Sequence, residues 1–364
     1  MFDAPLTEKP LRIVILGLSV TSSWGNDHAT TYRSLLAGLA ARGHQILFLE
    51  RDVPWYASQR DLPAPPWCEM GLYDSLNQLK SDYRQVVADA DLVMLGSYVP
   101  EGIKVGRWVL DTAQGATAFY DIDTPVTLDR LSRNDCEYLD RKLIPRFDLF
   151  LSFTGGPVLE RLEKQFKARR ALPLYCSVDP EKYYPETWPE RWDMAYMGTY
   201  SPDRQPGLER LLLKVARRWE IGRFAVVGPQ FPEEVRWPNN VGRLDHLPPD
   251  RHRAFYNAQR FTLNITRKPM VELGYSPSVR LFEAAACGVP VISDTWDGLD
   301  TFFEPDEEIL LADSPEEVIL HLRGHSIPES RAIGRRMRER VLAEHTGERR
   351  AETLESYHRL AAVG

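Results

Sequence analysis

The chain has 364 residues, which is enough for two ordinary domains with cores of their own. Its hydrophobic content of 43% and charged content of 27% are typical of a soluble globular protein. A formal net charge of −7 gives no electrostatic reason to expect DNA, RNA or an anionic membrane as a partner. A negatively charged small ligand would need positive groups gathered at one site.

The N-terminal segment and the cysteines indicate where the protein works. The segment MFDAPLTEKP carries acidic and proline residues where a secretory leader needs basic residues and an apolar run. No apolar stretch of the sequence approaches the ~20 residues of a membrane helix. The cysteines stand far apart without a C-x-x-C pair, which is typical of reduced thiols. We expect a cytoplasmic protein with no membrane span.

The first third of the chain alternates short apolar runs with amphipathic stretches. The apolar runs cover residues 11–17, 45–50, 91–97, 116–123 and 148–153, and an amphipathic helix is expected over 30–44. Short apolar strands separated by helices predict a parallel sheet that is covered on both faces.

A proline-rich stretch interrupts this alternation. Residues 172–192 contain four prolines, which oppose a continuous helix or a central strand, so we place the domain linker there. The alternation then resumes, with apolar runs at 193–200, 223–228, 260–266 and 289–293 and a helix over 206–219. The chain therefore divides into residues 1–172, residues 173–340 and a C-terminal helix, 341–364, that can return to the first domain.

The expected fold class is α/β, with two doubly wound, Rossmann-like domains that face each other across a cleft. Ligands of such sheets lie outside the carboxyl ends of the strands, so the functional site is expected in that cleft. The basic run RRMRER at 335–340 is interpreted as a solvated helix face, and a binding patch is the alternative.

One carboxylate lies in a helix that is otherwise apolar. The stretch SPSVRLFEAAACGVPVISD, residues 276–294, predicts a buried helix capped by Ser276 with Pro277 in its first turn, and then a buried strand. A buried carboxylate such as Glu283 is costly unless it is paired or hydrogen-bonded. One interpretation is an ion pair with Arg280, three residues earlier. The other is that Glu283 accepts hydrogen bonds from ligand hydroxyls, such as the two of a ribose.

The start of this helix offers a site for phosphate. The amides of Ser278, Val279 and Arg280 lie at a helix N-terminus, beside the hydroxyls of Ser276 and Ser278. Ribose and phosphate groups about one to two helical turns apart fit a nucleotide that lies along the helix.

The same stretch resembles the signature of family 4 glycosyltransferases of the GT-B fold, in which a Glu lies in a helix followed by A-x-G-x-P-V-I. The whole C-terminal half resembles the CgeB-like glycosyltransferases of the spore-maturation type. The matching segments are MGTYSPDRQPGLERLL (197–212), FYNAQRFTLNITR (255–267), residues 275–305 and EHTGERRAETLE (344–355). The segment YCSVDPEKYYP (175–185) resembles the linker of such enzymes.

This resemblance implies an acceptor in the N-terminal domain and a nucleotide-sugar, with UDP favoured, in the C-terminal domain. Glu283 then matches the Glu that binds the ribose hydroxyls. The family's E-x7-E motif places another Glu eight positions earlier, and this chain has Tyr275 there, with Glu272 off register. The earlier Glu normally touches the sugar. The donor sugar is therefore left open, and so is the stereochemical outcome, although the family favours retention.

Positive groups for a diphosphate follow two apolar runs of the second domain. The resemblance implies a positive residue in the first strand–helix loop, and GTYSPDRQ offers Arg204 there, with Gly198 and Thr199 allowing close backbone approach. Arg267 ends the run TLNITR and offers a second charge. The alternative for each arginine is a surface ion pair with an aspartate.

The motif YDID at 120–123 mimics the DxD motif with which another glycosyltransferase fold holds Mn²⁺. We interpret Asp121 and Asp123 instead as strand-end carboxylates that meet sugar or acceptor hydroxyls, and expect no metal. Capping of the following turn is the alternative for both residues.

The loop after the first run, GLSVTSSWGNDHATTY, contains no G-x-G-x-x-G, so the dinucleotide fingerprint is absent even though Glu50 ends the second run. His28 and the neighbouring Asp27 are candidate bases for the acceptor's proton, with a helix cap or a surface residue as the alternative.

The sequence therefore favours a metal-independent glycosyltransferase of hexosyltransferase type that needs no cofactor beyond its nucleotide-sugar donor. Two other functions stay open. One is a nucleotide-sugar-binding partner protein that has lost catalysis, which the Tyr275 substitution allows. The other is a nicotinamide-dependent oxidoreductase, which lacks its glycine fingerprint.

Overall fold

The computed structural model describes residues 9–24 and 26–362 and divides the chain into two compact units. Unit 1 comprises the residues up to Ser177 together with those from Thr346 onward, and unit 2 runs from Val178 to His345. Each break lies five residues beyond the boundary expected from the sequence, at 172 and at 340. Most of the MFDAPLTEKP segment, on which the expectation about a leader rests, lies outside the described residues.

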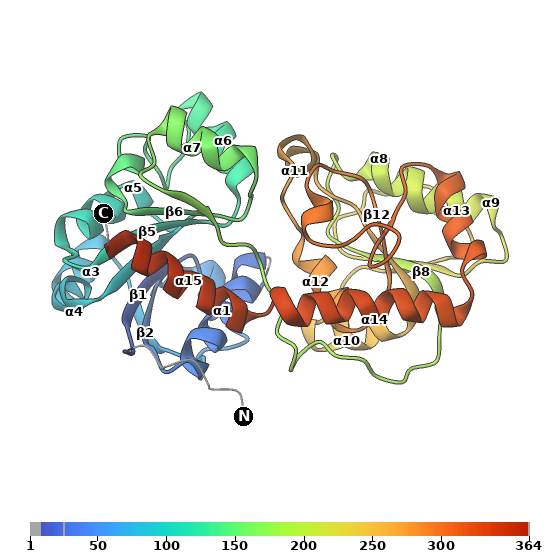
Figure 1. The fold of residues 1–364 in the computed structure, drawn as a ribbon, viewed down its shortest axis with the longest axis horizontal. Coiled ribbons are helices and arrows are strands. Elements are labelled where there is room, and N and C mark those ends of the chain that lie inside the picture. Colours follow the sequence, from blue (N-terminus) through green and yellow to red (C-terminus); the bar gives the residue numbers. More distant parts are fainter. Residues whose placement is uncertain (1–8, 25, 363–364) are drawn as a thin grey trace. The chain divides into compact units, whose positions relative to one another are not determined.

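Unit 1 is built on a seven-stranded parallel sheet with the strand order β3-β2-β1-β4-β5-β6-β7 (Figure 1). The strands are β1 (Arg12–Gly17), β2 (Gln45–Arg51), β3 (Glu69–Tyr73), β4 (Leu92–Gly96), β5 (Ala116–Asp121), β6 (Leu149–Ser152) and β7 (Ala171–Pro173). In the register of the sheet, Ile13 of β1 lies opposite Ile46 of β2 and Leu92 of β4. The order reverses between β1 and β4, and ligands of doubly wound sheets bind at such a reversal.

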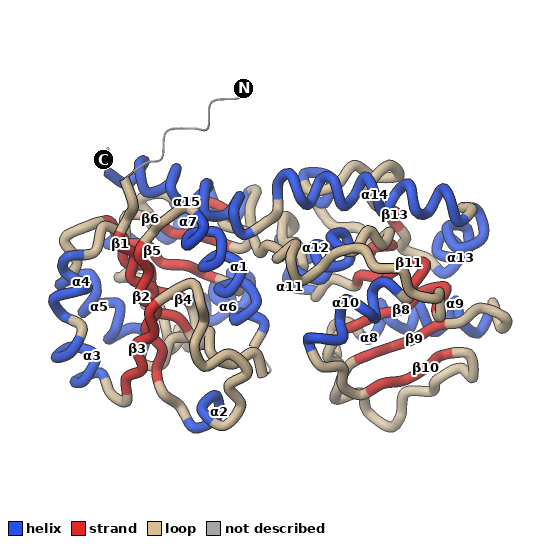
Figure 2. The backbone as a smooth tube through the Cα atoms, turned by 90° about the horizontal axis from the view of Figure 1, so that it is seen from below, coloured by secondary structure: helices blue, strands red, loops and turns tan. Residues whose placement is uncertain are grey.

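Helices flank this sheet, and the last helix of the chain is one of them (Figure 2). They are α1 (Asp27–Ala41), α2 (Pro54–Ala57), α3 (Leu76–Asp82), α4 (Arg84–Asp89), α5 (Gly102–Thr112), α6 (Thr124–Arg133), the 3₁₀ turn η1 (Ile144–Arg146), α7 (Pro157–Phe166) and α15 (Gly347–Ala362). α15 packs on α1 so closely that a β-carbon on Gly38 would lie 2.2 Å from the carbonyl oxygen of Gly347. A hydrogen bond also joins the two helices: Nε of Arg42, at the end of α1, donates to Glu355 of α15 at 2.6 Å.

Unit 2 repeats the architecture with six parallel strands in the order β10-β9-β8-β11-β12-β13 (Figure 1). They are β8 (Trp192–Met197), β9 (Phe224–Val227), β10 (Val241–Leu244), β11 (Gln259–Asn264), β12 (Val291–Ser293) and β13 (Leu310–Leu311). Thr262 of β11 lies opposite Ala195 of β8 and Val291 of β12. The order reverses between β8 and β11. The expected fold class, α/β with two doubly wound parallel sheets, is confirmed.

The helices of unit 2 include one continuous helical run with a π-helical turn in its middle. The elements are α8 (Gln205–Leu208), the π turn η2 (Glu209–Leu213), α9 (Lys214–Arg218), α10 (Pro249–Asn257), α11 (Lys268–Leu273), α12 (Val279–Ala286), the 3₁₀ turn η3 (Leu299–Thr301), α13 (Pro315–Gly324) and α14 (Ile327–Glu344). The run from α8 through α9 contributes three consecutive buried leucines, Leu211, Leu212 and Leu213, to the apolar core on the sheet.

Four strands are missing from the sequence expectation, and all four lie at the edges of the sheets. These are β3 and β7 in unit 1 and β10 and β13 in unit 2. An edge strand pairs on one side only and is not enclosed on both faces, so its sequence need not be a continuous apolar run. In β3 only two of the five residues are buried.

The expected cap of helix α12 is wrong by two residues. Ser278 is the cap, and its hydroxyl accepts a hydrogen bond at 3.3 Å from the amide two residues later. Ser276 and Pro277 precede the helix and are buried. Gly274 and Tyr275 both adopt positive φ, of 66° and 49°, so the chain turns just before this segment. Ser278 has the extended backbone conformation that is typical of an N-cap residue, with φ −82° and ψ 140°.

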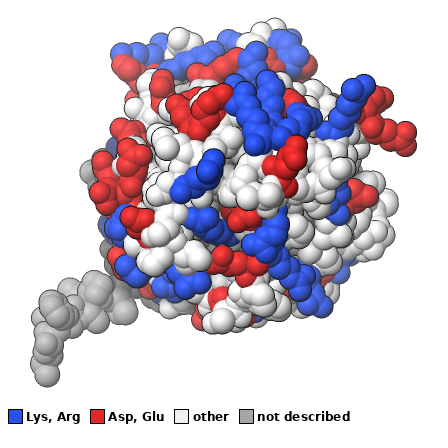
Figure 3. All heavy atoms as spheres, turned by 90° about the vertical axis from the view of Figure 1, so that its right-hand side faces the viewer, with Lys and Arg blue, Asp and Glu red and all other residues white. Residues whose placement is uncertain are grey.

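The basic run at 335–340 lies on α14, and three of its arginines bond to other groups of unit 2. Arg336 donates to the carbonyl oxygen of Glu307 (2.7 Å), Arg338 to that of Ala286 (3.1 Å), and Arg340 pairs with Glu308 (3.1 Å). Over the face of the molecule drawn in Figure 3, acidic and basic side chains are interspersed. Among the helices of the described ranges, none combines the length and the apolarity needed to cross a lipid bilayer.

The close approach of α1 and α15 predicts a position that tolerates no side chain. Gly38→Ala should lower the free energy of unfolding by about 1–3 kcal/mol, because the new methyl group meets the Gly347 carbonyl and forces the helices apart. Gly324→Ala in α13 is the matched control, since its β-carbon would meet no atom within 4 Å. Urea unfolding measures both, and equal stability of the two variants would contradict the packing described.

Candidate functional site

The loop that follows β8 in unit 2 holds an arginine against its own backbone. Arg204 donates from Nε to the hydroxyl of Ser201 (3.0 Å) and from Nη2 to the carbonyl oxygen of Thr199 (2.7 Å). The amide of Gly198 donates to Val227 at 2.8 Å. Gly228, at φ +147°, lies so near that a β-carbon there would be 2.0 Å from the Gly198 carbonyl oxygen. The glycines thus permit a tight loop in which Arg204 has a fixed direction.

Two further arginines lie close enough for their charges to act on Arg204. Burial lowers the pKa of the Arg204 guanidinium, and the positive charges of Arg280 and Arg267 act in the same direction. Arg267 follows β11, and its Nε lies 3.6 Å from Asp203 with 41% of the side chain exposed. Arg280 lies in the first turn of α12. We call these three residues the arginine cluster. Gathered guanidinium groups are the usual protein partners of phosphate oxygens.

The predicted phosphate-site residues around α12 take different positions. Val279 is the first residue of the helix and is partly exposed, as is its cap Ser278, whereas Ser276 is buried beneath them. Tyr275 donates from its amide to the Asp297 carbonyl oxygen at 2.6 Å. Its ring lies where a β-carbon on the neighbouring loop glycine, at 298, would meet it at 2.3 Å. Its ring is therefore packed on that loop.

Glu283 is buried in α12 and hydrogen-bonded to phenols. Its Oε2 accepts from the Tyr256 hydroxyl at 3.1 Å. Burial raises the pKa of Glu283, and the hydrogen bond from Tyr183 and the charge of Arg280 oppose that rise. Arg280 therefore acts on Glu283 through its charge, in keeping with part of the ion-pair interpretation. The two tyrosines were not predicted from the sequence, because Tyr183 lies in the linker and Tyr256 in another helix.

In unit 1 the two aspartates of YDID have different environments. Asp121 ends β5 and is fully buried, with Oδ1 accepting from the Thr127 hydroxyl (2.7 Å) and from the amide of Asp123 (3.3 Å). Its Oδ2 is buried without a hydrogen-bond partner in the described structure. Asp123, two residues later, is partly exposed and accepts from the Tyr98 hydroxyl at 2.9 Å. Asp123 is thus at the surface of the unit, and Asp121 supports it from below.

Tyr98 connects the predicted residues of unit 1 to one another. Its ring lies 5.3 Å from that of His28 and 4.5 Å from that of Tyr138, centroid to centroid. The Arg130 guanidinium lies 5.6 Å from the centre of the Tyr98 ring. We call His28, Tyr98, Asp123, Arg130 and Tyr138 the tyrosine cluster. Tyr98 was missed by the sequence analysis, although its place directly after an apolar run was a usable signal.

In unit 1, the loop between β1 and α1 donates hydrogen bonds to a carboxylate of the same unit. Glu50, at the end of β2, is fully buried and accepts from the Ser19 hydroxyl (3.0 Å), the Val20 amide (2.8 Å), and the Thr21 amide (3.1 Å) and hydroxyl (2.6 Å). In dinucleotide-binding domains such amides receive phosphate and such a carboxylate receives ribose. Here the loop amides donate their hydrogen bonds to the carboxylate of Glu50 instead. The side chain of Asp27, the other candidate base nearby, lies outside the described residues.

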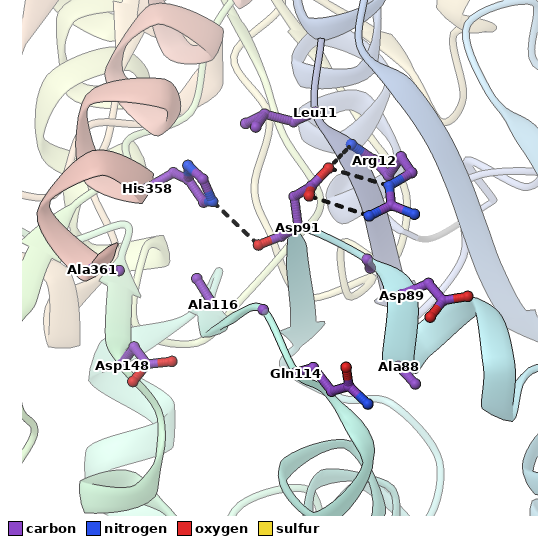
Figure 4. Close-up of a pocket in the computed structure, with 12 residues that line it drawn as sticks. Leu11, Arg12, Ala88, Asp89, Asp91, Gln114, Ala116, Asp148, His358 and Ala361 are labelled. Carbon is purple, nitrogen blue, oxygen red and sulfur yellow. Dashed lines mark hydrogen bonds and ion pairs between the residues drawn. The ribbon is translucent and has the colours of Figure 1, made fainter. Parts of the chain in front are cut away.

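A cavity of about 600 Å³ in unit 1 lies at the opposite end of the strands (Figure 4). Its walls come from the segments that lead into β1, β4, β5 and β6 and from α15. Asp91 is central: it pairs with Arg12 at 3.4 Å, and its carbonyl oxygen lies 3.2 Å from His358 Nε2. The cavity contains none of the predicted site residues.

Comparison with known proteins supports the assignment of the fold. Residues 204–356, a range that includes the arginine cluster and Glu283, match a family described as glycosyl transferase-like. No curated protein matches the sequence. The sucrose-phosphate synthase of Thermosynechococcus elongatus is 17% identical, with a TM-score of 0.64 over 97% of this chain and 100% of that one.

Two further solved structures are similar over almost the whole chain. Anabaena HepE in complex with UDP is 14% identical, with a TM-score of 0.69 over 95% of this chain and 99% of that one. An α-glucosyltransferase in complex with UDP and a 13-mer DNA is 12% identical, with a TM-score of 0.70 over 96% and 100%. The chain therefore has the GT-B fold.

The buried carboxyl group of Asp121 predicts a pH-dependent contribution to stability. Burial raises the pKa of Asp121 to about 7, although the Thr127 hydrogen bond opposes this. Since the folded state then holds the proton more tightly than the unfolded chain, the contribution is complete below about pH 4 and is lost as the pH rises to about 7. Asp121→Asn, which cannot titrate, should gain about 2–3 kcal/mol in unfolding free energy relative to the native protein between pH 5 and pH 8.

The control for this measurement is Asp129→Asn, at an exposed carboxylate of α6 that pairs with Arg133 at 2.5 Å. Urea unfolding at several pH values gives the two differences. Stability curves of native protein and Asp121→Asn that stay parallel from pH 5 to pH 8 would show that Asp121 is ionised throughout.

Proposed function

We propose that the protein is a glycosyltransferase of the CgeB-like type that transfers a hexose from a UDP-sugar to an acceptor hydroxyl. The observation that carries this proposal is the arginine cluster, in which Arg280 of the first turn of α12 and Arg267 act on Arg204, with Glu283 about one helical turn further along α12. A diphosphate requires several positive groups, and the paired hydroxyls of a ribose are well matched by a carboxylate. The arrangement therefore has the order of groups found in a nucleoside diphosphate.

The choice of UDP is supported by the structural relatives. HepE was solved with UDP and with UDP-glucose, and the α-glucosyltransferase with UDP and with UDP-glucose. The glycosyl transferase-like match covers the donor-binding residues proposed here. Tyr183 and Tyr256 would hold Glu283 in place, so that its carboxylate meets the ribose without a change of rotamer.

The reaction breaks the bond between the sugar C1 and the phosphate oxygen, and the electron pair leaves with the diphosphate. The guanidinium groups of Arg204, Arg267 and Arg280, together with the amides of the helix N-terminus, stabilise the negative charge that develops there. These groups supply the positive charge, so we propose that transfer needs no metal. The acceptor oxygen forms the new bond to C1 and gives up its proton.

Unit 1 would bind the acceptor through His28, Asp123 and the supporting Asp121. With retention, which the family resemblance favours, the proton can leave with the diphosphate, and no opposing base is needed. With inversion, Asp123 or His28 would take the proton. The four cysteines are all free thiols, which suits a reducing, cytoplasmic compartment.

Tyr275 favours a second candidate function, a nucleotide-sugar-binding partner protein without turnover. Its ring is packed against the neighbouring loop, and a phenol cannot replace the charge of the Glu found at this position in the family. The oxidoreductase alternative loses support, because Glu50 is already bound by its own loop and is not available to a nicotinamide dinucleotide.

A donor screen tests the proposed function. Incubation with UDP-, GDP- and TDP-hexoses, followed by mass spectrometry, should show hydrolysis or transfer from a UDP-hexose, with the rate unchanged in EDTA because the arginines stabilise the leaving group. Binding of donors without any turnover would instead establish the partner protein. Activity lost in EDTA and restored by Mn²⁺ would contradict metal independence.

Glu283→Gln tests the ribose assignment. The variant keeps the hydrogen-bonding shape but loses the charge, so UDP binding measured by calorimetry should weaken by about 1–3 kcal/mol with little change in melting temperature. Glu272→Gln, at a side chain in α11 that is 62% exposed, is the control and should bind UDP normally. Unchanged UDP affinity with a large drop in melting temperature would make Glu283 a structural residue only.

A further inference from the structure

We propose that the tyrosine cluster is a binding site for a neutral saccharide acceptor, and that Tyr98 is the positioning residue that holds Asp123 toward the acceptor's hydroxyl groups. This inference rests on the proposed function, because it names the class of molecule that receives the sugar.

The chemistry of the cluster suits hydroxylated rings. It brings together a carboxylate, two phenols, an imidazole and a guanidinium, from segments that follow β1, β4 and β5 and from α6. Carboxylates and guanidinium groups bind sugar hydroxyls, and the partly exposed ring of Tyr98 can pack against the C–H groups of a sugar, while the buried ring of Tyr138 supports that of Tyr98. A lipid acceptor would call for a continuous apolar surface instead.

The backbone of Tyr98 is held in a conformation that only a few residues adopt. Its φ of +63° lies in the left-handed region, which is uncommon and costly for a bulky side chain. Such residues persist where the surrounding structure determines them, and they gather at functional sites. The preceding Ser97 is fixed between β4 and β5: its amide donates to the Tyr120 carbonyl oxygen (3.0 Å), and its hydroxyl accepts from the Ile122 amide (3.1 Å).

Tyr98 and Asp123 form a supported pair. The Tyr98 hydroxyl donates to Oδ2 of Asp123 at 2.9 Å, which restricts the rotation of the carboxylate. Tyr138 stacks against Tyr98, and its hydroxyl lies 2.8 Å from that of Thr127. Thr127 in turn donates to Asp121 at 2.7 Å. The chain of contacts runs from the core of unit 1 to Asp123, so the direction of this carboxylate is built into the fold.

The charge of the cluster disfavours acceptors that are rich in phosphate. Asp123 is the partly exposed carboxylate of the cluster, and Arg130, beside the ring of Tyr98, is its basic member. A phosphate placed against Asp123 would meet a like charge in a partly desolvated site. A neutral sugar hydroxyl can donate to the same carboxylate without that cost. The predicted class is therefore a neutral saccharide rather than a nucleic acid or a phosphorylated glycan.

Saturation-transfer NMR on the full chain tests the site without a donor. The probes are neutral disaccharides ending in glucose, galactose or mannose, and the corresponding 6-phosphates. We expect at least one neutral disaccharide to bind, its 6-phosphate to bind at least tenfold more weakly, and Tyr98→Phe to weaken the neutral ligand about tenfold. Tyr357→Phe, which removes another tyrosine hydroxyl bond of unit 1 (to the Pro173 carbonyl oxygen at 3.0 Å), should bind normally.

UDP binding by the same samples separates this inference from the proposed function. The native protein and Tyr98→Phe should bind UDP equally, and with a working donor the variant should raise the acceptor KM more than it lowers kcat. Tyr98→Gly keeps the left-handed backbone and should also lose the disaccharide. Preference for the 6-phosphates, equal disaccharide binding by Tyr98→Phe and native protein, or UDP binding without binding of any disaccharide would overturn the inference.

Discussion

The positive charge gathered around Arg204 is the constraint on which the proposed donor site of unit 2 depends. Arg204 is partly buried, and its burial and the charges of Arg280 and Arg267 lower the pKa of its guanidinium. The fold keeps Arg204 in place through the carbonyl oxygen of Thr199 and the hydroxyl of Ser201, and the start of α12 places Arg280. A bound diphosphate would offset the repulsion among these charges and accept hydrogen bonds from the same guanidinium groups.

The two units share a sheet topology but differ in the loop that follows the first strand. In each, the strand order reverses beside the first strand, and a loop that leads into a helix follows that strand. In unit 2 this loop carries Arg204, which the hydroxyl of Ser201 and the carbonyl oxygen of Thr199 hold in place. In unit 1 the equivalent loop is bound by Glu50, so its amides are already satisfied. The groups proposed for the acceptor in unit 1 follow β4 and β5 instead, as the phenol of Tyr98 and the carboxylate of Asp123.

The sequence predicts the interior of this protein better than its edges. Central strands are enclosed on both faces and appear as continuous apolar runs, so β1, β4, β8 and β11 are visible in the sequence; the edge strands β3, β7, β10 and β13 lack that enclosure and are not. The position of a helix cap was also misjudged, because Ser276 and Ser278 are equally good caps until the turn at Tyr275 chooses between them. Local patterns carry no information about that turn.

The site shows the same limit. Residues that follow apolar runs, such as Arg204, Arg267 and Asp123, can be proposed from the sequence, because the ends of parallel strands meet at one edge. Tyr183 and Tyr256 cannot be proposed in this way, because they hydrogen-bond to Glu283 from segments that are distant in the sequence. The separate roles of Asp121 and Asp123 are likewise invisible, because burial distinguishes two aspartates that are neighbours in the chain.

The most direct measurement of the central claim is a crystal structure of the protein with UDP. The account predicts the diphosphate oxygens on the guanidinium groups of Arg204, Arg267 and Arg280, and both ribose hydroxyls hydrogen-bonded to Glu283. UDP bound at the β1–α1 loop of unit 1, or bound in unit 2 without contact to Glu283 and the arginine cluster, would contradict it.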